Sequence, residues 1–328
     1  MIELRNHKAK EKFSQKHLVT LLDYSKDEIL QVLSVGLNIK EKFKAGIQVD
    51  HLKGQSLAMI FTKSSTRTRV SFEMGTVQMG GFPMFLSSND IQLGRGETIA
   101  DTAGVLSRMV NGIMIRTYAH SDVEDLAKYG TIPVINGLTD WVHPCQALAD
   151  IMTFYEYKGN LSGKKLAFFG DGNNVCHSLM VICAKLGIDF AVAYPEGHAP
   201  DPKVVEASLA CAKESGATIT LTNDPLVAVA GADAVYTDVW ASMGQEKEFL
   251  ARKAKLENYA VTEELFGKAK PDAIFLHCLP AHRGEEVAAA VIDGPRSAIF
   301  DEAENRMHAQ KGLMAMLMSG KSYEELMK

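Results

Sequence analysis

The chain has 328 residues, which is more than one hydrophobic core usually holds, so we expect two domains. Its 35 basic and 40 acidic residues give a formal net charge of -5, which argues against general binding to nucleic acid or to anionic membranes. The five cysteines include no C-x-x-C pair, and an odd number is not typical of a disulfide framework. The first 25 residues lack the apolar core of a signal peptide, and no run reaches the roughly 18 apolar residues of a membrane span. We therefore predict a cytoplasmic protein with no nucleic-acid or membrane partner.

Apolar runs alternate with helical patterns along the first part of the chain. The apolar runs predict strands at residues 56–61, 82–86, 112–116 and 132–135. Helical spacing of apolar residues predicts helices at about 70–79, 98–109, 122–128 and 147–157. This alternation is the βα pattern of a parallel sheet.

A second series of strands follows the glycine-containing turn at residues 159–163. Strands are predicted at 165–169, 190–194, 218–221, 234–239 and 273–279, with helices in the intervals. We predict an α/β fold with domains at residues 1–150 and 151–328, each a mainly parallel sheet flanked by helices. The last helix, at about 303–318, is expected to cross back onto the first domain.

Residues 64–69, with the sequence SSTRTR, lie between a predicted strand and a predicted helix. The unpaired N–H groups of a helix N-terminus stabilise phosphate oxygens, and hydroxyl groups add to such a site. The hydroxyl groups here belong to Ser65, Thr66 and Thr68. Arg67 adds a planar guanidinium that can donate two parallel hydrogen bonds to a phosphate. A helix cap is the alternative interpretation, but it would not need two arginines. Arg69 lies about 200° around the helix from Arg67, so we assign it to a structural ion pair.

Further polar residues follow the ends of predicted strands, where ligands bind in open parallel sheets. Arg116 ends an apolar strand and is either solvated or a second cation for the phosphate. His143 and Gln146 stand at the start of a helix, where both can donate hydrogen bonds to a carbonyl oxygen. A helix cap with a surface histidine is the alternative for this segment. Six such strand ends predict one cleft between the two domains.

The loop at residues 170–174 follows a strand and opens a helix, as in dinucleotide-binding proteins. The G-x-G-x-x-G pattern requires glycine where Val175 stands, so nicotinamide binding is not favoured. The two adjacent asparagines, Asn173 and Asn174, are instead better placed to hydrogen-bond the charged groups of a small amino-acid substrate. A left-handed turn at Asn173 is an equally physical explanation of this pair of asparagines.

Two more strand ends carry a carboxylate and a thiol. Asp238 can bind an ammonium group, and the loop of small residues after it can close over a ligand. Cys278 is either an acid, base or hydrogen-bond partner, or an inert buried thiol. The spacing of His277, Cys278 and His282 matches no structural zinc pattern, so we predict no metal site.

Taken together, five motifs resemble the aspartate/ornithine carbamoyltransferase family over essentially the whole chain. They are residues 65–69 (STRTR), 143–146 (HPCQ), 238–244 (DVWASMG), 277–280 (HCLP) and 304–306 (ENR). The first two report the carbamoyl phosphate half of the site, and the DVWASMG and HCLP motifs are selective for the ornithine branch. The resemblance implies that the chain transfers the carbamoyl group of carbamoyl phosphate to the side-chain amine of L-ornithine, giving citrulline and phosphate in arginine metabolism.

The resemblance also implies the residues of each half of the site. Carbamoyl phosphate would be bound by Ser65, Thr66, Arg67, Thr68, Gln92, Arg116, His143, Gln146, Cys278, Leu279 and Arg306. Ornithine would be bound by Asn174, Asp238, Ser242 and Met243, and the catalytic residues would be Arg116, His143, Asp238 and Cys278. Gln92 resembles a loop position that reaches a neighbouring subunit, and the family implies a homotrimer or an assembly of trimers. No redox, organic or metal cofactor is implied.

Three alternatives stay open at this point. A related carbamoyltransferase for putrescine, N-acetylornithine or aspartate would share the phosphate motifs. A nicotinamide-dependent dehydrogenase is a more distant alternative, opposed by Val175. An inactive binding or regulatory relative would be expected to have lost at least one charged motif residue.

Overall fold

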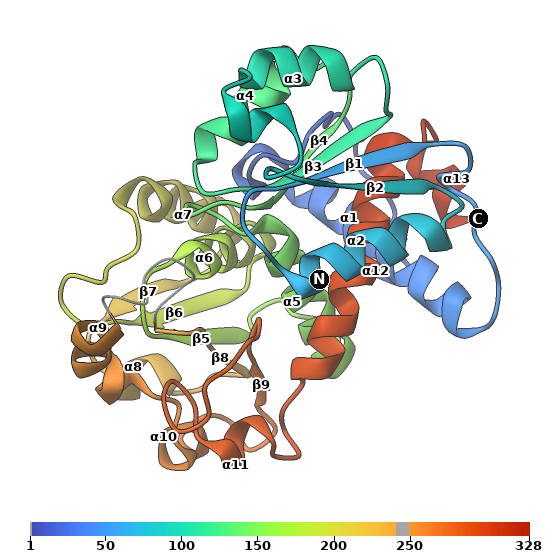
Figure 1. Cartoon of the computed structure of the whole chain (residues 1–328). Helices are drawn as coiled ribbons and strands as arrows, with labels where there is room; N and C mark the ends of the chain where they lie inside the picture. The colour runs from blue at the N-terminus through green and yellow to red at the C-terminus, as the bar shows by residue number, and fades with distance from the viewer. Residues whose placement is uncertain (1, 241–248) are drawn as a thin grey trace. The chain divides into compact units, whose positions relative to one another are not determined.

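The computed structural model describes residues 2–240 and 249–328, which form two compact units, each built on a parallel sheet (Figure 1). Residues 3–152 and 304–328 form what we call the N-terminal unit. Residue 2 and residues 153–303 form the central unit. The division falls inside two helices, α5 (Pro144–Lys158) and α12 (Ile299–Met318). This architecture confirms the predicted α/β class.

The N-terminal unit has a four-stranded parallel sheet in the order β2-β1-β3-β4. The strands are β1 (Ser56–Phe61), β2 (Phe82–Ser87), β3 (Gly112–Arg116) and β4 (Val134–Leu138). The predicted bounds of β1 and β3 are correct, whereas β4 lies further along the chain than the predicted 132–135. Asn136 interrupts the apolar run, but it is buried in the strand, and its side-chain amide donates to the carbonyl of Val19 at 2.9 Å. A polar residue whose side-chain donor has an acceptor of this kind is compatible with a buried strand.

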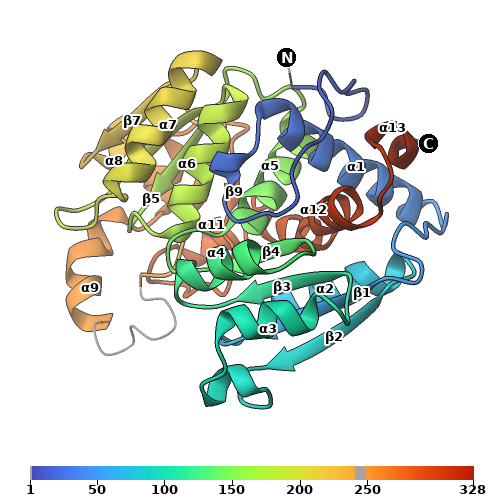
Figure 2. The ribbon, with the colours of Figure 1, turned by 90° about the horizontal axis from the view of Figure 1, so that it is seen from above.

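Helices α3 (Ile99–Leu106) and α4 (His120–Tyr129) pack together on one face of this sheet (Figure 2). Their apolar side chains share one buried cluster with alternate residues of β1, β3 and β4. The members that carry this contact are Ala58, Ile60, Ala103, Ile113, Ile115, Val123, Leu126 and Val134. The predicted helix at 98–109 ends earlier than expected, at Leu106, where the chain turns toward β3. Two short 3-10 helices, η1 (Leu21–Asp23) and η2 (Gln92–Arg95), complete this part of the unit.

The other long helices of this unit come from both halves of the chain. They are α1 (Lys26–Lys44), α2 (Thr66–Gln78) and the part of α12 from residue 304 onward, followed by the short α13 (Tyr323–Met327). Helix α1 was not predicted from the sequence; it begins with a capping box in which Ser25 and Glu28 bond each other's backbone N–H groups. Helix α12 crosses α1 so closely that a Cβ at Gly312 would lie 2.3 Å from the carbonyl oxygen of Val32. The predicted return of the last helix to the first domain is thus confirmed, although the helix begins at Ile299 rather than near 303.

The central unit has a five-stranded parallel sheet in the order β7-β6-β5-β8-β9. The strands are β5 (Lys165–Phe169), β6 (Asp189–Ala193), β7 (Ile219–Thr222), β8 (Ala234–Thr237) and β9 (Ile274–Leu276). Strands β8 and β9 are shorter than the predicted 234–239 and 273–279. Strand β8 ends where the Asp238 carboxylate accepts the N–H of Val239, and β9 ends where Glu302 accepts the N–H of His277. Side chains therefore replace the sheet as hydrogen-bond partners at both carboxyl ends.

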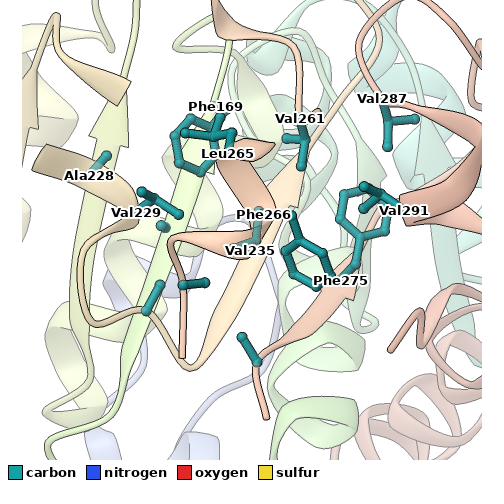
Figure 3. Packing of buried hydrophobic residues seen from close by; sticks show 14 of the residues in the cluster. Phe169, Ala228, Val229, Val235, Val261, Leu265, Phe266, Phe275, Val287 and Val291 are labelled. Atoms are coloured by element: carbon teal, nitrogen blue, oxygen red, sulfur yellow. The ribbon is translucent and has the colours of Figure 1, made fainter. Parts of the chain in front are cut away.

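Helices cover both faces of this sheet. On one face, α8 (Pro225–Val229), α10 (Glu263–Gly267) and α11 (Ala289–Ile292) close a buried apolar cluster (Figure 3). Three neighbouring strands, β5, β8 and β9, contribute the side chains of Phe169, Val235 and Phe275 to that cluster. Helices α6 (Asn174–Leu186) and α7 (Pro202–Ser215) pack against each other on the other face, and α9 (Phe249–Leu256) leads into η4 (Glu257–Tyr259). Over the described ranges, none of the helices combines the length and the apolar character needed to cross a membrane.

Candidate active site

The N-terminus of α2 lies just after the carboxyl end of β1 in the N-terminal unit. Ser65 is the N-cap residue, with an extended backbone, and its hydroxyl accepts the N–H of Thr68 at 3.2 Å. Thr66 is exposed, Arg67 is half-buried and Thr68 is buried in the first turn. The first turn of a helix presents N–H groups that have no partner within the helix and a partial positive charge. The sequence motif thus stands at the kind of helix end that stabilises an anion.

Two buried arginines donate to one hydroxyl beside this helix end. The Thr68 Oγ1 atom accepts from Arg116 Nη1 at 3.4 Å and from Arg306 Nη2 at 3.2 Å. Arg116 is 8% exposed and comes from the end of β3, whereas Arg306 is 2% exposed and comes from α12. Holding two guanidinium groups out of water costs free energy, which a bound anion would offset.

His143 lies in the positive field of this part of the molecule. Burial lowers its pKa well below the usual value, and the charges of Arg306, Arg116, Arg67 and Lys63 lower the pKa further. The imidazole is therefore neutral at pH 7, and it can donate one hydrogen bond without adding a charge. It stands immediately before Pro144, the first residue of α5, and its carbonyl accepts the N–H of Gln146 at 3.1 Å.

The Gln146 amide is fixed at both of its ends. Its Oε1 atom accepts from Arg306 Nη1 at 2.7 Å, and its Nε2 atom donates to Asp150 Oδ1 at 2.8 Å. Asp150 was missed from the sequence, although its position four residues after Gln146 on one helix places the two side chains on one face. We call Ser65, Thr68, Arg116, His143, Gln146 and Arg306 the anion group.

Three further residues of the N-terminal unit are not members of the anion group. Arg69 forms an ion pair with Glu73 at 3.0 Å and lies over the ring of Phe85, which confirms its structural role. Gln92 is exposed in η2. Lys63, which was not predicted, is buried beside the ring of Tyr118 and pairs with Asp140 at 3.3 Å.

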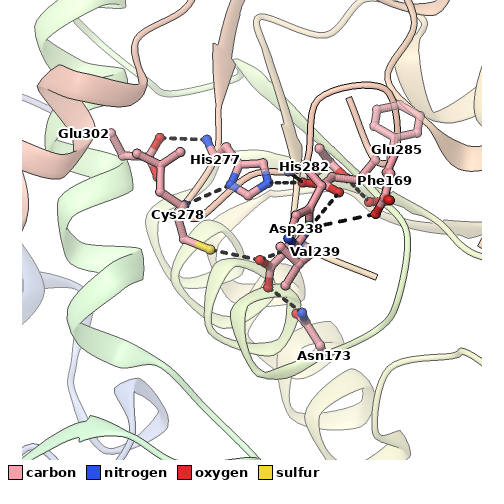
Figure 4. A network of polar contacts seen from close by, with 12 residues as sticks. Phe169, Asn173, Asp238, Val239, His277, Cys278, His282, Glu285 and Glu302 are labelled. Carbon is pink, nitrogen blue, oxygen red and sulfur yellow. Dashed lines mark hydrogen bonds and ion pairs between the residues drawn. The ribbon is translucent and has the colours of Figure 1, made fainter. Parts of the chain in front are cut away.

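In the central unit, the carboxyl ends of the neighbouring strands β5, β8 and β9 carry a second group of polar residues (Figure 4). The Asp238 carboxylate accepts three hydrogen bonds. Cys278 Sγ donates to its Oδ1 at 3.0 Å, the N–H of Val239 donates to the same oxygen at 2.8 Å, and Asn173 Nδ2 donates to Oδ2 at 2.6 Å. We call Asp238 and Cys278 the dyad. The structure joins by a hydrogen bond two of the residues that the resemblance implied to be catalytic.

His277 anchors the dyad from the neighbouring position. Its Nδ1 atom accepts the N–H of Leu279 at 2.9 Å, so Nε2 carries the proton and faces Glu286 Oε1 at 3.3 Å. The backbone N–H of His277 donates to Glu302, whose other oxygen accepts the hydroxyl of Tyr236. Glu286 and Glu302 were missed because nothing near His277 in the sequence marks them as its partners.

The loop after β5 corrects one prediction. Asn173 does not adopt a left-handed turn; it has a φ of -87° and caps α6 by accepting the N–H groups of Val175 and Cys176. Its amide then reaches Asp238, whereas Asn174, the residue predicted to bind ornithine, is half-buried as the first residue of α6. The side chain that the sequence offered as a turn former is therefore the one that contacts the dyad.

The same loop has little room for a dinucleotide. A Cβ at Gly172 would lie 2.3 Å from the backbone nitrogen of Pro200, and the neighbouring Asp171 carboxylate pairs with Arg252 and with His198 Nδ1. A pyrophosphate would meet a carboxylate at this turn, which opposes a dinucleotide site. Ser242 and Met243, also predicted to bind ornithine, lie outside the described residues.

Asp238, His277 and Cys278 each offer one atom within 4.8 Å of the others, which is compatible with a metal ion. Both His277 nitrogens already have partners, however, and the Cys278 thiol donates to Asp238. A metal would have to replace these bonds, so the arrangement fits hydrogen bonding better than metal ligation.

Two parallel α/β sheets, a positive group at one helix N-terminus and a carboxylate–thiol pair after another strand are features of α/β enzymes that act on small charged substrates. Comparison with known proteins specifies the family. Residues 16–156 match the family model described as the carbamoyl-P binding domain of aspartate/ornithine carbamoyltransferase, and residues 162–317 match its Asp/Orn binding domain. The chain therefore belongs to the aspartate/ornithine carbamoyltransferase family.

Similar proteins cover nearly the whole chain. An ornithine carbamoyltransferase of Anoxybacillus flavithermus is 59% identical over 92% of this chain and 96% of its own length. One of Carboxydothermus hydrogenoformans is 58% identical over 92% of this chain and 97% of its own. The solved structure of ornithine carbamoyltransferase from Pyrococcus furiosus has a TM-score of 0.92 at 53% identity, covering 95% of this chain and 99% of that one.

Proposed function

We propose that the protein is an ornithine carbamoyltransferase, which converts carbamoyl phosphate and L-ornithine to L-citrulline and phosphate. The observation that carries this proposal is the buried Thr68 hydroxyl shared by Arg116 and Arg306, beside a neutral His143. The relatives that are 58% and 59% identical bear this name, which supports the same conclusion. The chemistry is a group transfer that needs no electron carrier.

In this proposal the phosphate of carbamoyl phosphate lies at the N-terminus of α2. The helix N–H groups and the side chains of Ser65, Thr66, Arg67 and Thr68 bind its oxygens. Arg116 bridges the phosphate and the carbamoyl oxygen, and His143, Gln146 and Arg306 hold the carbamoyl group; Gln92, Cys278 and Leu279 complete the predicted set. When the amine attacks, negative charge grows on the carbamoyl oxygen, and positioned donors such as these stabilise it most in the transition state.

The second substrate must arrive as a free amine. An alkyl ammonium has a pKa of about 10.4, so the side-chain amine of ornithine has to lose a proton before it can attack the carbamoyl carbon. The dyad has the chemistry for this step, because the Asp238 carboxylate, which the Cys278 thiol orients by a hydrogen bond, attracts the ammonium and can accept its proton. A new C–N bond then forms, the C–O bond to phosphate breaks, and the phosphate leaves already paired with cations. Asn174, Ser242 and Met243 remain the proposed contacts to the rest of ornithine.

The test compares four amines with the purified chain. Carbamoyl phosphate is supplied with ornithine, putrescine, N-acetylornithine or aspartate, and the ureido product is measured by mass spectrometry. Citrulline should form fastest by at least tenfold. Faster carbamoylation of any other amine would overturn the assignment of ornithine.

An Arg67→Ala variant tests the phosphate half separately. Removing the guanidinium should weaken carbamoyl phosphate binding at least tenfold in calorimetry, because a charge-assisted bond to a dianion is lost. A matched Arg69→Ala variant should bind normally, since Arg69 pairs with Glu73. Normal binding by Arg67→Ala would contradict the site.

We also propose that the chain works as a trimer in the cytoplasm. Exposed apolar side chains line one face of α2 at Val70, Met74 and Val77, and Phe82 is 66% exposed on the edge strand β2. Such a patch is typical of a surface that binds another protein surface. All five cysteines are free thiols, which suits a reducing compartment. Light scattering should give the mass of three chains for the wild type and of one chain for the double variant Met74→Glu/Val77→Glu. An active wild-type monomer would contradict the trimer.

A further inference from the structure

A second cluster of ligating side chains lies in the turn between β9 and α11. His282 Nδ1 is 3.9 Å from Glu285 Oε2 and 3.7 Å from Glu286 Oε2 (Figure 4). One ligand atom from each of the three residues lies within 4.8 Å of the other two. The cluster takes no part in the proposed carbamoyl transfer.

Glu286 gives the cluster an unusual oxygen. Its side chain is completely buried, and its Oε1 atom accepts from His277 Nε2 at 3.3 Å and from the N–H of His282 at 2.6 Å. Its Oε2 atom is also buried but accepts no hydrogen bond among the described residues, and it faces His282 Nδ1. A buried carboxylate oxygen without a hydrogen bond costs free energy, so this oxygen points to a ligand.

The nearby cationic side chains do not occupy the oxygens that would bind a positive ligand. Arg283 is turned toward Asp293, to which it donates two hydrogen bonds at 2.8 and 2.6 Å. Lys253 lies 3.9 Å from Glu285 Oε1, which is the oxygen that does not face His282. Two carboxylates and one imidazole therefore share a small space that is open to solvent on the side of His282, whose side chain is 54% exposed.

We propose that His282 Nδ1, Glu285 Oε2 and Glu286 Oε2 bind a divalent first-row transition-metal ion of the Zn²⁺ type. One nitrogen and two oxygen ligands suit this class, and water would occupy a fourth position. Ligands at about 2.0–2.1 Å from a tetrahedral ion lie about 3.4 Å apart. The two separations from His282 exceed this value by only a few tenths of an ångström, and the ligand atoms of the cluster all lie within 4.8 Å of one another. Movements of the exposed His282 and half-buried Glu285 side chains can therefore bring the three atoms to binding distance of one ion.

The ion would join an exposed turn to a buried carboxylate. It would satisfy Glu286 Oε2 while Oε1 keeps its bond to His277, an arrangement in which one carboxylate orients a histidine and binds a metal. Because the ion binds the folded chain, it should raise the melting temperature in a concentration-dependent way.

The experiment titrates the metal-free full chain with Co²⁺ and with Zn²⁺. Calorimetry should give one equivalent, weakened at least tenfold in His282→Ala and in Glu285→Gln, while the matched Cys278→Ser variant binds like the wild type. The visible spectrum of the Co²⁺ form should lack a thiolate charge-transfer band. Unchanged binding in both His282→Ala and Glu285→Gln would overturn the proposal, and so would loss of binding in Cys278→Ser. These measurements do not depend on carbamoyl transfer, so their outcome is independent of the proposed function.

Discussion

The anion group and the dyad contrast in the charge that they present to a ligand. The anion group consists mainly of donors and cations: two buried guanidinium groups share Thr68, and burial together with their charges keeps His143 neutral. The dyad presents a carboxylate, Asp238, which is held by one thiol, one amide and one backbone N–H. The first is suited to a phosphorylated group and the second to an ammonium.

The two groups also differ in how the chain builds them. Residues of the anion group come from α2, β3, α5 and α12, so distant segments must assemble before it exists. The dyad and its supports follow three strands that are neighbours in one sheet. A substitution in the anion group can therefore test that group without altering the dyad, and the reverse is also true.

The largest expected effect is that of Arg306→Met. The change removes the cation that bonds both Thr68 and Gln146, and it should lower kcat/KM for carbamoyl transfer by about 10³-fold, because a donor to the developing oxyanion is lost. Steady-state kinetics provide the measurement. The matched control is Arg69→Met, which should stay within about twofold of the wild type since its partner is Glu73. A loss below tenfold in Arg306→Met would contradict the role of the anion group.

Asp238→Asn should act on the other substrate. It preserves size and removes the charge that attracts the ammonium, so kcat/KM for ornithine should fall about 10²-fold. Carbamoyl phosphate binding, measured by calorimetry, should remain within twofold of the wild type. Equal weakening of both substrates would remove the distinction between the two groups.

A smaller effect is expected at Asp150, which positions Gln146 rather than touching substrate. Asp150→Ala frees the amide and should lower kcat about tenfold, with little change in the KM for ornithine. Asp150→Asn keeps an oxygen that can accept the same hydrogen bond, so it should recover most of the rate. Equal losses in the two variants would show that charge, and not orientation, is the contribution of this residue.

Lys311 provides the smallest effect, on stability. Burial lowers its pKa from 10.5 to about 8, so between pH 8 and 10.5 the unfolded chain binds more protons than the folded chain. This residue's contribution to stability must therefore rise with pH across that window. Lys311→Met removes the buried charge and should add about 1 kcal/mol to the free energy of unfolding at pH 7, after loss of the bond to Gln78.

Urea unfolding at pH 7 and at pH 9.5 measures the difference in the free energy of unfolding between Lys311→Met and the wild type. The advantage of the variant should shrink at the higher pH. A variant that is less stable at pH 7, or an advantage that grows with pH, would contradict the sign of the argument.

The local sequence pattern was enough to predict most of the strands and the position of several candidate site residues at strand ends. Strands β1, β3 and β5 have the predicted bounds because each is an uninterrupted apolar run, and Thr68, Arg116 and Cys278 follow strand ends as expected. The bounds of strand β4 were predicted wrongly because Asn136 interrupts the apolar run in the sequence, whereas in the structure Asn136 is buried and its side-chain nitrogen donates to the carbonyl of Val19.

Partners that are distant along the chain could not be predicted in the same way. Glu302 lies 25 residues from His277, and Arg306 lies 160 residues from Gln146. Nothing in the local sequence ranks one carboxylate over another as the partner of a given N–H, because tertiary packing makes that choice. Asn173 shows the limit even at short range: it caps α6 locally, but its contact with Asp238 depends on where β8 ends.

The position of Arg306 in α12 also sets an order of events during synthesis. Gly312 lets α12 lie directly against α1, so the N-terminal unit is completed only after residues 153–303 of the central unit have been synthesised. Until then the nascent unit lacks one of the two guanidinium groups that meet at Thr68. Full affinity for a phosphorylated ligand should therefore arise only once Arg306 has been synthesised and α12 has packed against α1, so a shorter nascent chain would bind the ligand less tightly.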